Sequence, residues 1–313
     1  MRTAIWGGGS LGLLWGARVA RWNSDVTIVT RTKMQAQALM TAGLTLKHLD
    51  GKEETIPIKA FAEDSFKTDE VASRFDCIFV TVKQFHLPEV AANILACAHE
   101  ETVVLLWQNG LGQDNYFVET PHPHLCAAVT TEGALRRHDN FIWHTGTGHT
   151  WIGALAKERR LPSWFLHEVK RWERSAPLSY EENIHLRMWE KVMINSVINP
   201  LTTLLDVPNG FLTRLPMNEM MEGILQEAHT VARAEGVDVG ELGALKEKVA
   251  TVYQLTAANT SSMLQDRKAG RRTEIQSING AIVKIGRQHG IATPIHSLLV
   301  HLVEALYDKG DLV

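Results

Sequence analysis

The first half of the chain alternates short apolar runs with longer amphipathic segments. The runs have the length of strands, and the one that ends at Val82 is almost wholly apolar, as in a parallel strand buried on both faces. Strands separated by helices of about 10–15 residues are typical of a doubly wound α/β domain. The predicted strands are residues 3–6, 25–30, 76–82 and 102–107, the predicted helices are 11–22 and 87–97, and three later strands, expected to be antiparallel, are 125–131, 141–145 and 150–153.

The second half shows helical periodicity with almost no strand signal. A stretch at 175–180 has the composition of a linker. The pattern therefore predicts an N-terminal Rossmann-type doubly wound sheet, residues 1–182, followed by an all-α C-terminal domain, residues 183–313. The predicted helices of that domain are 184–199, 218–234, 242–258, 273–289 and 295–307.

Composition narrows the class of protein. The chain has 313 residues, 45% of them hydrophobic, and a formal net charge of −3, which indicates neither a nucleic-acid nor a membrane-surface partner. The apolar runs fall short of the roughly 20 residues of a membrane span, and the N-terminus has no signal-peptide pattern. The three cysteines and 14 histidines lack zinc spacing, so we expect buried free thiols, no metal and a cytoplasmic protein.

A glycine-rich motif follows the first predicted strand. Residues Gly7, Gly8, Gly9, Ser10, Leu11 and Gly12 fit G-x-G-x-x-G, open a helix and lie within a strand–helix–strand unit of about 30 residues. In such a motif Gly7 permits a tight turn, Gly9 lets the backbone approach a pyrophosphate, and Gly12 lets helix and strand pack closely. The helix N-terminus favours phosphate. The alternative is a glycine-rich turn without a ligand.

Three polar residues follow neighbouring predicted strands. Thr30-Arg31-Thr32-Lys33 contains no carboxylate for a ribose 2′-hydroxyl, whereas Arg31 can bind a 2′-phosphate, so NADPH is favoured over NADH. Lys83 and Asn109 follow the next two strands and should reach the same carboxyl edge of the sheet. The alternative for the two basic residues is that they are solvated surface charges.

A polar row marks the first helix of the C-terminal domain. Lys191, Asn195 and Asn199 are spaced i, i+4, i+8 on a helix in which much of the rest is Val, Met and Ile. Burying them without partners is costly, so the row is either solvated or lines a polar cavity. A lysine there suits proton donation to a ketone that is reduced by hydride.

A second polar set lies further along the chain. Asn259 and Ser262 are spaced to share a helix face, and the basic cluster 267–272 and Thr273-Glu274 follow. The plain interpretation is an amphipathic helix, a solvated turn and a helix N-capped by Thr273. The alternative is that the cluster adds positive potential near an anionic ligand.

Taken together, these segments resemble the ketopantoate reductase (2-dehydropantoate 2-reductase) family of pantothenate biosynthesis, the route to coenzyme A. The resemblance covers nearly the whole chain; Glu132 and Gly133 stand where relatives often carry other residues. The matching segments are residues 7–12, 80–83, 108–112, 189–195, 199–210 and 259–280.

The resemblance implies roles for individual residues. Lys191 is the implied proton donor, and Asn109 the contact shared by nicotinamide and substrate. Lys83, Gly133 (through its backbone) and Glu274 are implied cofactor contacts. The implied substrate contacts are Asn109, Lys191, Asn195, Asn199, Asn209, Asn259 and Ser262.

The implied reaction is NADPH-dependent reduction of ketopantoate to pantoate, with hydride delivered to C2 and a proton from Lys191. One alternative keeps the fold and cofactor but reduces another 2-oxo acid. A second is a non-catalytic NADPH-sensing protein. The sequence leaves the oligomeric state open, with a homodimer as one arrangement, and leaves open whether Glu274 also acts on substrate.

Overall fold

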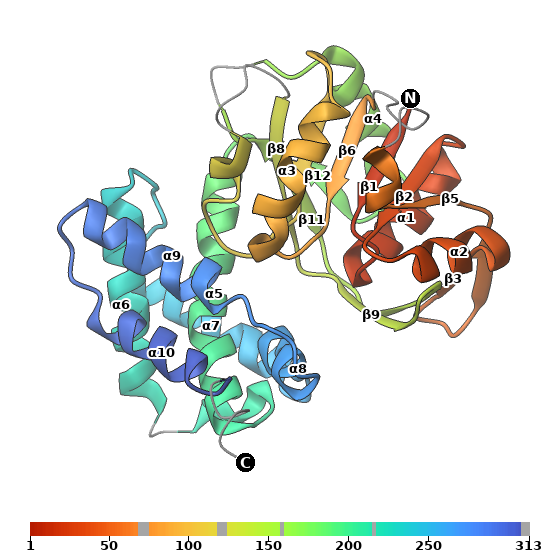
Figure 1. Cartoon of the computed structure of the whole chain (residues 1–313). Coiled ribbons are helices and arrows are strands. Elements are labelled where there is room, and N and C mark those ends of the chain that lie inside the picture. Colours follow the sequence, from red (N-terminus) through yellow and green to blue (C-terminus); the bar gives the residue numbers. More distant parts are fainter. Residues whose placement is uncertain (68–74, 118–123, 157–159, 215–216, 308–313) are drawn as a thin grey trace. The chain divides into compact units, whose positions relative to one another are not determined.

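The computed structural model describes residues 1–67, 75–117, 124–156, 160–214 and 217–307 (Figure 1). The chain forms two compact units, Met1–Gln108 with Gln113–Ile184, and Asn109–Gly112 with His185–Val313. The short segment that carries Asn109 thus belongs with the second unit. No helix in the described ranges has the length and apolar character that a membrane span needs.

An eight-stranded sheet forms the first unit, in the order β12-β11-β8-β7-β6-β1-β2-β5. Neighbouring strands are parallel except β8 and β11, which are antiparallel. Because β1 lies between β2 and β6, the chain reverses direction across the sheet at β1, the position where doubly wound folds bind ligands. The strands are β1 (Thr3–Trp6), β2 (Val26–Thr30), β5 (Lys59–Ala62), β6 (Cys77–Val80), β7 (Val103–Leu106), β8 (His124–Thr130), β11 (Thr150–Ala154) and β12 (Leu178–Tyr180).

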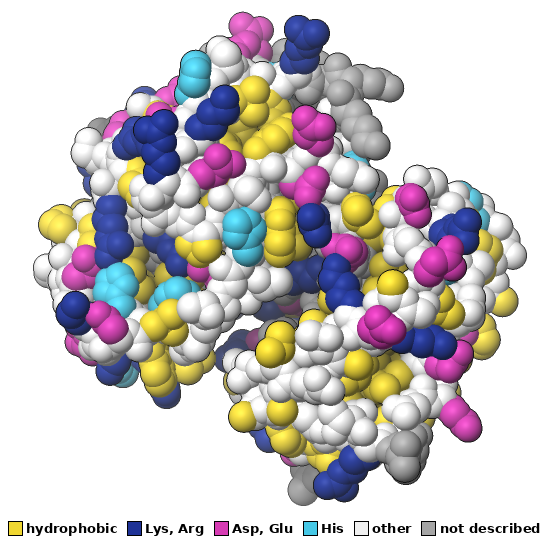
Figure 2. Space-filling view, turned by 180° about the vertical axis from the view of Figure 1, so that it is seen from behind, with side chains coloured by type: hydrophobic (Ala, Val, Ile, Leu, Met, Phe, Trp, Pro, Cys, Tyr) yellow, Lys and Arg dark blue, Asp and Glu magenta, His cyan; other side chains and the backbone are white. Residues whose placement is uncertain are grey.

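Two hydrophobic clusters cover the two faces of this sheet. Along β1, Ile5 packs in one cluster while Ala4 and Trp6 pack in the other, because successive side chains of a strand point to opposite faces. Helices α1 (Ser10–Trp22) and α4 (Ser163–Glu173) complete the first cluster, and α3 (Leu87–Ala96) completes the second. The fold is therefore the doubly wound α/β class that the sequence predicted. Charged side chains of both signs are interspersed over the surface in Figure 2.

A four-stranded sheet, in the order β4-β3-β10-β9, adjoins α1. Its inner side chains Leu44, Leu46 and Ile142 enter the first cluster, while Lys47 and Trp143 lie on its outer face. The predicted strand 141–145 belongs here, where it pairs in parallel with β3 and antiparallel with β9. The strands are β3 (Leu44–Lys47), β4 (Glu53–Ile56), β9 (Gly133–His138) and β10 (Phe141–Gly146).

Several elements of the first unit were not predicted. The segment expected to be a linker contains the edge strand β12, which pairs with β11, so that interpretation of 175–180 was wrong. Helix α2 (Lys33–Ala42) directly follows Arg31 and is N-capped by Thr32, whose side chain accepts a hydrogen bond from Gln35 N–H. Short one-turn helices lie at η1 (Glu63–Lys67), η2 (Gln84–His86) and η3 (Asp114–Phe117).

The second unit is helical throughout its described part. Its elements are α5 (Ile184–Leu205), η4 (Asn209–Thr213), α6 (Asn218–Ala234), α7 (Leu242–Leu255), α8 (Ser262–Lys268), α9 (Ile275–Gln288) and α10 (Pro294–Glu304).

Three expectations about this unit were wrong. Helix α5 continues past Asn199 and through Pro200 to Leu205. Helix α8 begins at Ser262 with Ser261 as its N-cap, so Asn259 lies outside the helix and shares no face with Ser262. Helix α9 is N-capped by Glu274 rather than by Thr273, which is buried just before it.

Candidate functional site

The glycine loop between β1 and α1 has a backbone that side chains would obstruct. Gly7 has a φ of 117°, and a Cβ there would lie 2.9 Å from Thr81 Oγ1. A Cβ on Gly12 would lie 1.9 Å from the Gly7 carbonyl oxygen. The Thr81 hydroxyl donates to that carbonyl at 3.0 Å and thereby fixes the turn. The turn and the close packing of α1 thus depend on glycine at both positions.

The opposite side of the loop is open. Gly9 is the N-cap of α1 and provides no side-chain cap, and a Cβ there would meet nothing within 4 Å. A phosphate can therefore approach the backbone closely at Gly9. The first N–H groups of α1 and the positive end of its dipole favour negative charge there. These features fit a dinucleotide pyrophosphate.

Two side chains that no sequence motif singles out, Gln35 and Arg136, hold the glycine loop in place. Buried Gln35 donates from Nε2 to the Gly8 carbonyl at 2.7 Å and to the Asp139 carbonyl at 3.0 Å. Arg136 on β9 donates from Nη1 to the Gly8 carbonyl at 3.2 Å, and its N–H donates to Ser10 Oγ at 3.1 Å. Their contacts with the loop join residues as many as 128 positions apart, so a local sequence pattern does not reveal them.

The other predicted cofactor contacts of the first unit lie at the ends of its strands. Exposed Arg31 directly follows β2 and precedes α2. Lys83 follows β6, is half-buried and is the N-cap of η2. Since β1, β2 and β6 are parallel neighbours, their carboxyl ends meet at one edge of the sheet. Gly133 instead begins β9, beside Gly146 of β10.

Glu132, next to Gly133, forms a buried ion pair. Both of its carboxylate oxygens accept from the Arg18 guanidinium, at 2.5 and 2.7 Å. The Glu132 side chain is 0% exposed and that of Arg18 is 11% exposed. Arg18 also lies 5.0 Å from the centre of the Trp15 ring. This bidentate pair joins α1, whose N-terminus carries the glycine loop, to the start of β9.

Asn109 and Glu274 meet within the second unit. Asn109 Nδ2 donates to Glu274 Oε2 at 3.0 Å, across 165 residues of sequence. Beside them Leu111 N–H donates to the Ser277 carbonyl at 3.1 Å. Gly110 has a φ of 110°, and a Cβ there would lie 2.1 Å from that carbonyl. The structure thus joins two residues that the sequence treated as separate contacts.

The polar row lies on α5 as its spacing predicted. Lys191 and Asn195 are half-buried and Asn199 is buried, while Val192, Met193 and Ile198 are packed in the interior. Two residues of the row are therefore partly accessible to solvent, and the third, Asn199, is enclosed. An ammonium donor and two amides in succession can bind and protonate an oxygen-rich substrate.

Helix α5 is unbroken at Pro200 because another helix supplies the missing donor. Pro200 has no N–H for the Ser196 carbonyl, four residues earlier. Asn279 of α9 donates to that carbonyl from Nδ2 at 2.9 Å. Nδ2 of the same Asn279 lies 3.0 Å from Nδ1 of buried His296, whose Nε2 lies 3.0 Å from the Ile224 carbonyl. A neutral His296 protonated on Nε2 satisfies both contacts.

Replacing Asn279 with Ala should lower the free energy of unfolding by about 2–3 kcal/mol. The change leaves the Ser196 carbonyl and His296 Nδ1 buried without this donor, each at the cost of an unsatisfied polar group. Urea denaturation measures the effect. The control is Gln276→Ala, which removes an exposed hydrogen bond from the same helix and should cost under about 1 kcal/mol. Equal losses in the two variants would contradict the role assigned to Asn279.

His296 should make the stability of the protein depend on pH. Burial lowers its pKa from 6.5 to about 4, because the imidazolium loses its hydration. As pH falls from 6.5 to 4, the unfolded chain binds a proton that the folded chain does not, so unfolding becomes easier by about 3 kcal/mol. Denaturation midpoints of wild type and His296→Gln, compared at pH 7 and pH 4, isolate this term. His301→Gln, on the exposed side of α10, is the control; a wild-type slope in His296→Gln would refute the assignment.

The remaining predicted substrate contacts lie around η4 and the start of α8. Asn209 is buried, its Nδ2 donates to Thr256 Oγ1 at 3.0 Å, and its N–H donates to the Asn259 carbonyl at 3.0 Å. Asn209 Oδ1 is buried without a hydrogen-bond partner among the described residues. The side chains of Asn259 and Ser262 are exposed. The structure therefore brings Asn209 and Asn259 together.

The basic cluster 267–272, which begins in the last turn of α8, mainly supports helix ends. Arg267 donates to the Thr203 carbonyl near the end of α5 at 2.6 Å, and Lys268 pairs with Asp206 at 2.7 Å. Arg271 pairs with Asp266 at 2.9 Å. Cations beside the carbonyl end of a helix stabilise its dipole. These contacts account for three of the four basic residues as structural groups.

The sequence predicted buried free thiols, and the structure confirms this. Cys77, Cys97 and Cys126 are free and buried, and burial raises the pKa of each thiol, which makes them poor nucleophiles. Within the described ranges no group of three or more His, Cys, Asp or Glu side chains could hold a metal ion.

Comparison with known proteins identifies the family. Residues 3–157 match the family model described as ketopantoate reductase PanE/ApbA, and residues 183–307 match its C-terminal model. The 2-dehydropantoate 2-reductase of Vibrio cholerae is 32% identical, with 98% of each chain covered. That of Halobacterium salinarum is 34% identical, with 99% of this chain and all of the other covered.

Solved structures agree with this assignment. The probable 2-dehydropantoate 2-reductase of Bacillus subtilis superposes with a TM-score of 0.81 at 28% identity, covering 98% of this chain and 100% of the other. A D-mandelate dehydrogenase complex with NADH and anilino(oxo)acetate shares the fold, with a TM-score of 0.87 at 24% identity and 99% coverage of both chains. The chain belongs to the ketopantoate reductase family of oxidoreductases.

Proposed function

We propose that the protein reduces 2-dehydropantoate to pantoate with NADPH. The observation that carries this proposal is the half-buried row of Lys191, Asn195 and Asn199 on α5, in a chain whose curated relatives are named 2-dehydropantoate 2-reductases. A protein that only sensed a nucleotide would have no need of a proton donor beside two amides on α5.

The first unit supplies groups suited to the cofactor. The open glycine loop and the N-terminus of α1 would hold the pyrophosphate, Arg31 the 2′-phosphate, and Lys83 a further anionic or polar group. When bound, the nicotinamide supplies the hydride that adds to C2 of the 2-oxo acid. Two residues of the second unit would also take part: Glu274 would accept a hydrogen bond from the cofactor, and Asn109, which donates a hydrogen bond to Glu274, would contact both cofactor and substrate.

The second unit supplies groups suited to the 2-oxo acid. The Lys191 ammonium would donate a hydrogen bond to the C2 carbonyl oxygen and protonate it as negative charge develops there. The amides of Asn195 and Asn199, with Asn209, Asn259 and Ser262, would bind the carboxylate and hydroxyl oxygens. In the reverse direction Lys191 would act as the base.

A substrate panel tests the proposal. We expect NADPH consumption to be fastest, by kcat/KM, with 2-dehydropantoate among 2-oxo acids that include pyruvate, 2-oxoisovalerate and phenylglyoxylate. A preference for another acid would redirect the proposal to that substrate, and phenylglyoxylate is included because a mandelate dehydrogenase shares the fold. Tight NADPH binding without turnover on any acid would instead support a sensor.

A further inference from the structure

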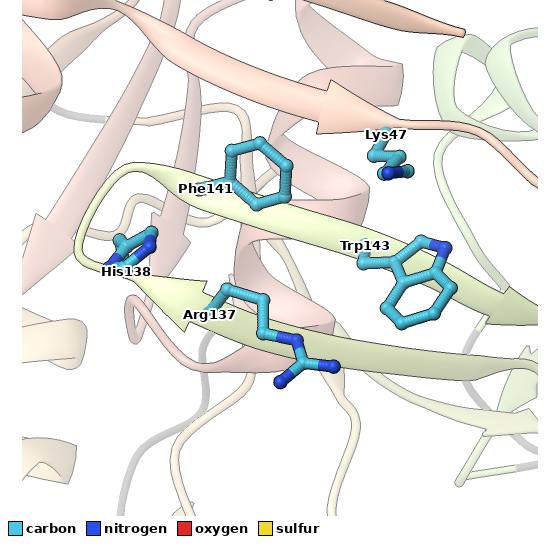
Figure 3. Close-up of a pocket in the computed structure, with 5 residues that line it drawn as sticks. All are labelled: Lys47, Arg137, His138, Phe141 and Trp143. Carbon is cyan, nitrogen blue, oxygen red and sulfur yellow. The ribbon is translucent and has the colours of Figure 1, made fainter. Parts of the chain in front are cut away.

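Strand β9 presents two consecutive arginines on opposite sides of the small sheet. Successive side chains of a strand alternate between faces. Arg136 points toward the glycine loop, where it donates to the Gly8 carbonyl, whereas Arg137 lies on the outer face with its guanidinium carbon 5.4 Å from the centre of the Trp143 ring (Figure 3). The pair therefore offers two equal charges, one residue apart, with only one beside the loop.

Arg136 lies at the junction of the two segments that are suited to cofactor phosphates. Gln35 bonds to the Gly8 carbonyl and to the Asp139 carbonyl, and its own N–H donates to Thr32 Oγ1 at 3.3 Å. Thr32 directly follows Arg31. The glycine loop and the turn after β9 are thus tied to the buried Gln35 side chain, and the segment after β2 is tied to the Gln35 backbone. The Arg136 guanidinium donates to the same Gly8 carbonyl.

The Arg136 guanidinium keeps an edge for an anion. Its side chain is 41% exposed, and both of its contacts to described residues, the Gly8 carbonyl and the Asp139 carboxylate at 3.8 Å, use Nη1. The bond to Gly8 and the nearby carboxylate orient the planar group, while Nη2 makes no hydrogen bond among the described residues. A fixed guanidinium fork is well matched to a phosphate oxygen pair.

We propose that Arg136 is a second ligand of the 2′-phosphate of NADPH and, with Arg31, determines the preference for NADPH over NADH. The inference rests on the proposed use of NADPH. The side of the loop decides which phosphate is involved. The N-terminus of α1 after Gly9 serves the pyrophosphate, whereas Arg136 contacts Gly8, on the side that Gln35 ties to the Arg31 segment.

Calorimetric binding of NADP⁺ and NAD⁺ to Arg136→Ala tests the proposal without requiring turnover. Loss of a charge-assisted hydrogen bond should weaken NADP⁺ binding by about 10- to 100-fold and NAD⁺ binding by less than about 3-fold. Arg31→Ala is the comparison, and Arg136→Lys, which keeps the charge but not the fork, should recover part of the loss. Arg137→Ala removes the same charge from the outer face and should bind both nucleotides as wild type does.

Three results would overturn the inference. In the first, Arg136→Ala binds NADP⁺ as tightly as wild type does. In the second, Arg136→Ala weakens the binding of NADP⁺ and NAD⁺ equally, which would assign Arg136 to the structure of the loop or to the pyrophosphate. In the third, Arg137→Ala weakens NADP⁺ binding as much as Arg136→Ala does. A wild type that binds NADP⁺ more tightly than NAD⁺ yet does not reduce 2-dehydropantoate would contradict the proposed substrate alone. A wild-type protein that binds NAD⁺ more tightly than NADP⁺ would contradict both the proposed use of NADPH and the role of Arg136.

Discussion

Changing Lys191 to Ala should lower turnover of the 2-oxo acid by about 10²- to 10⁴-fold, the usual contribution of a positioned general acid. The proton that we propose Lys191 donates is needed only as the alkoxide forms, so the loss should appear mainly in kcat. NADPH binding, measured by fluorescence titration, should stay within about 2-fold of wild type, since the groups proposed for the cofactor phosphates lie on the first unit.

Lys246→Ala is the matched control for Lys191. Lys246 is another lysine of the second unit, but it pairs with exposed Glu222 at 2.5 Å on the surface. Its removal should leave kcat unchanged and cost no more than about 1 kcal/mol of stability. Wild-type turnover by a folded Lys191→Ala enzyme would remove Lys191 from the mechanism, and a loss confined to KM would make it a binding group only.

Changing Arg18 to Met should lower the free energy of unfolding by about 3–5 kcal/mol. Methionine keeps most of the apolar stem beside Trp15, but the fully buried Glu132 carboxylate loses both charge-assisted hydrogen bonds. A buried carboxylate without a cation either stays ionised, at the cost of its lost hydration, or takes up a proton. The measurement is chemical denaturation near pH 7.

Arg21→Met provides the contrast on the same helix. Arg21 also pairs with a glutamate, Glu54, but both side chains are about 40% exposed, so the pair should contribute only about 0–1 kcal/mol. The double variant Arg18→Met, Glu132→Leu should be more stable than Arg18→Met alone, because it leaves no buried charge. Equal losses for Arg18 and Arg21 would show that the buried pair carries no special weight.

The elements with strong periodicity could be predicted from sequence. Strand β1 and helix α6 occupy the predicted residues. The apolar run of β1 indicates a buried strand, and the clear 3.6-residue period of α6 indicates an amphipathic helix. Strands β3, β4 and β5 are as short as β1, but each contains at least one charged residue, so none of them stands out as an apolar run. Strand β12 was taken for a linker because its three residues are ordered by pairing with β11, which is a non-local interaction.

The residues of the candidate site also divide into those that a local sequence pattern predicts and those that it does not. The glycine motif and the row on α5 are local patterns, since i, i+4 spacing alone places Lys191, Asn195 and Asn199 on one face of a helix. The groups that position them are not local. Gln35 and Arg136 reach the loop from α2 and β9, and Asn279 reaches α5 across 83 residues of sequence. The local sequence pattern contains no signal for such partners, because they lie far apart along the chain.

The proline in α5 also bears on the order in which the molecule forms. An isolated helix with an internal proline pays about 3 kcal/mol, and the Ser196 carbonyl has no partner within the helix. Asn279 becomes available only when α9 has docked, and its orientation depends on His296 of α10. The polar row spans this point, so the half of α5 that carries Asn199 gains its stability from a side chain that the ribosome adds 83 residues after Ser196. A nascent chain in which α9 and α10 have not yet been made would therefore hold this row in an unfinished helix.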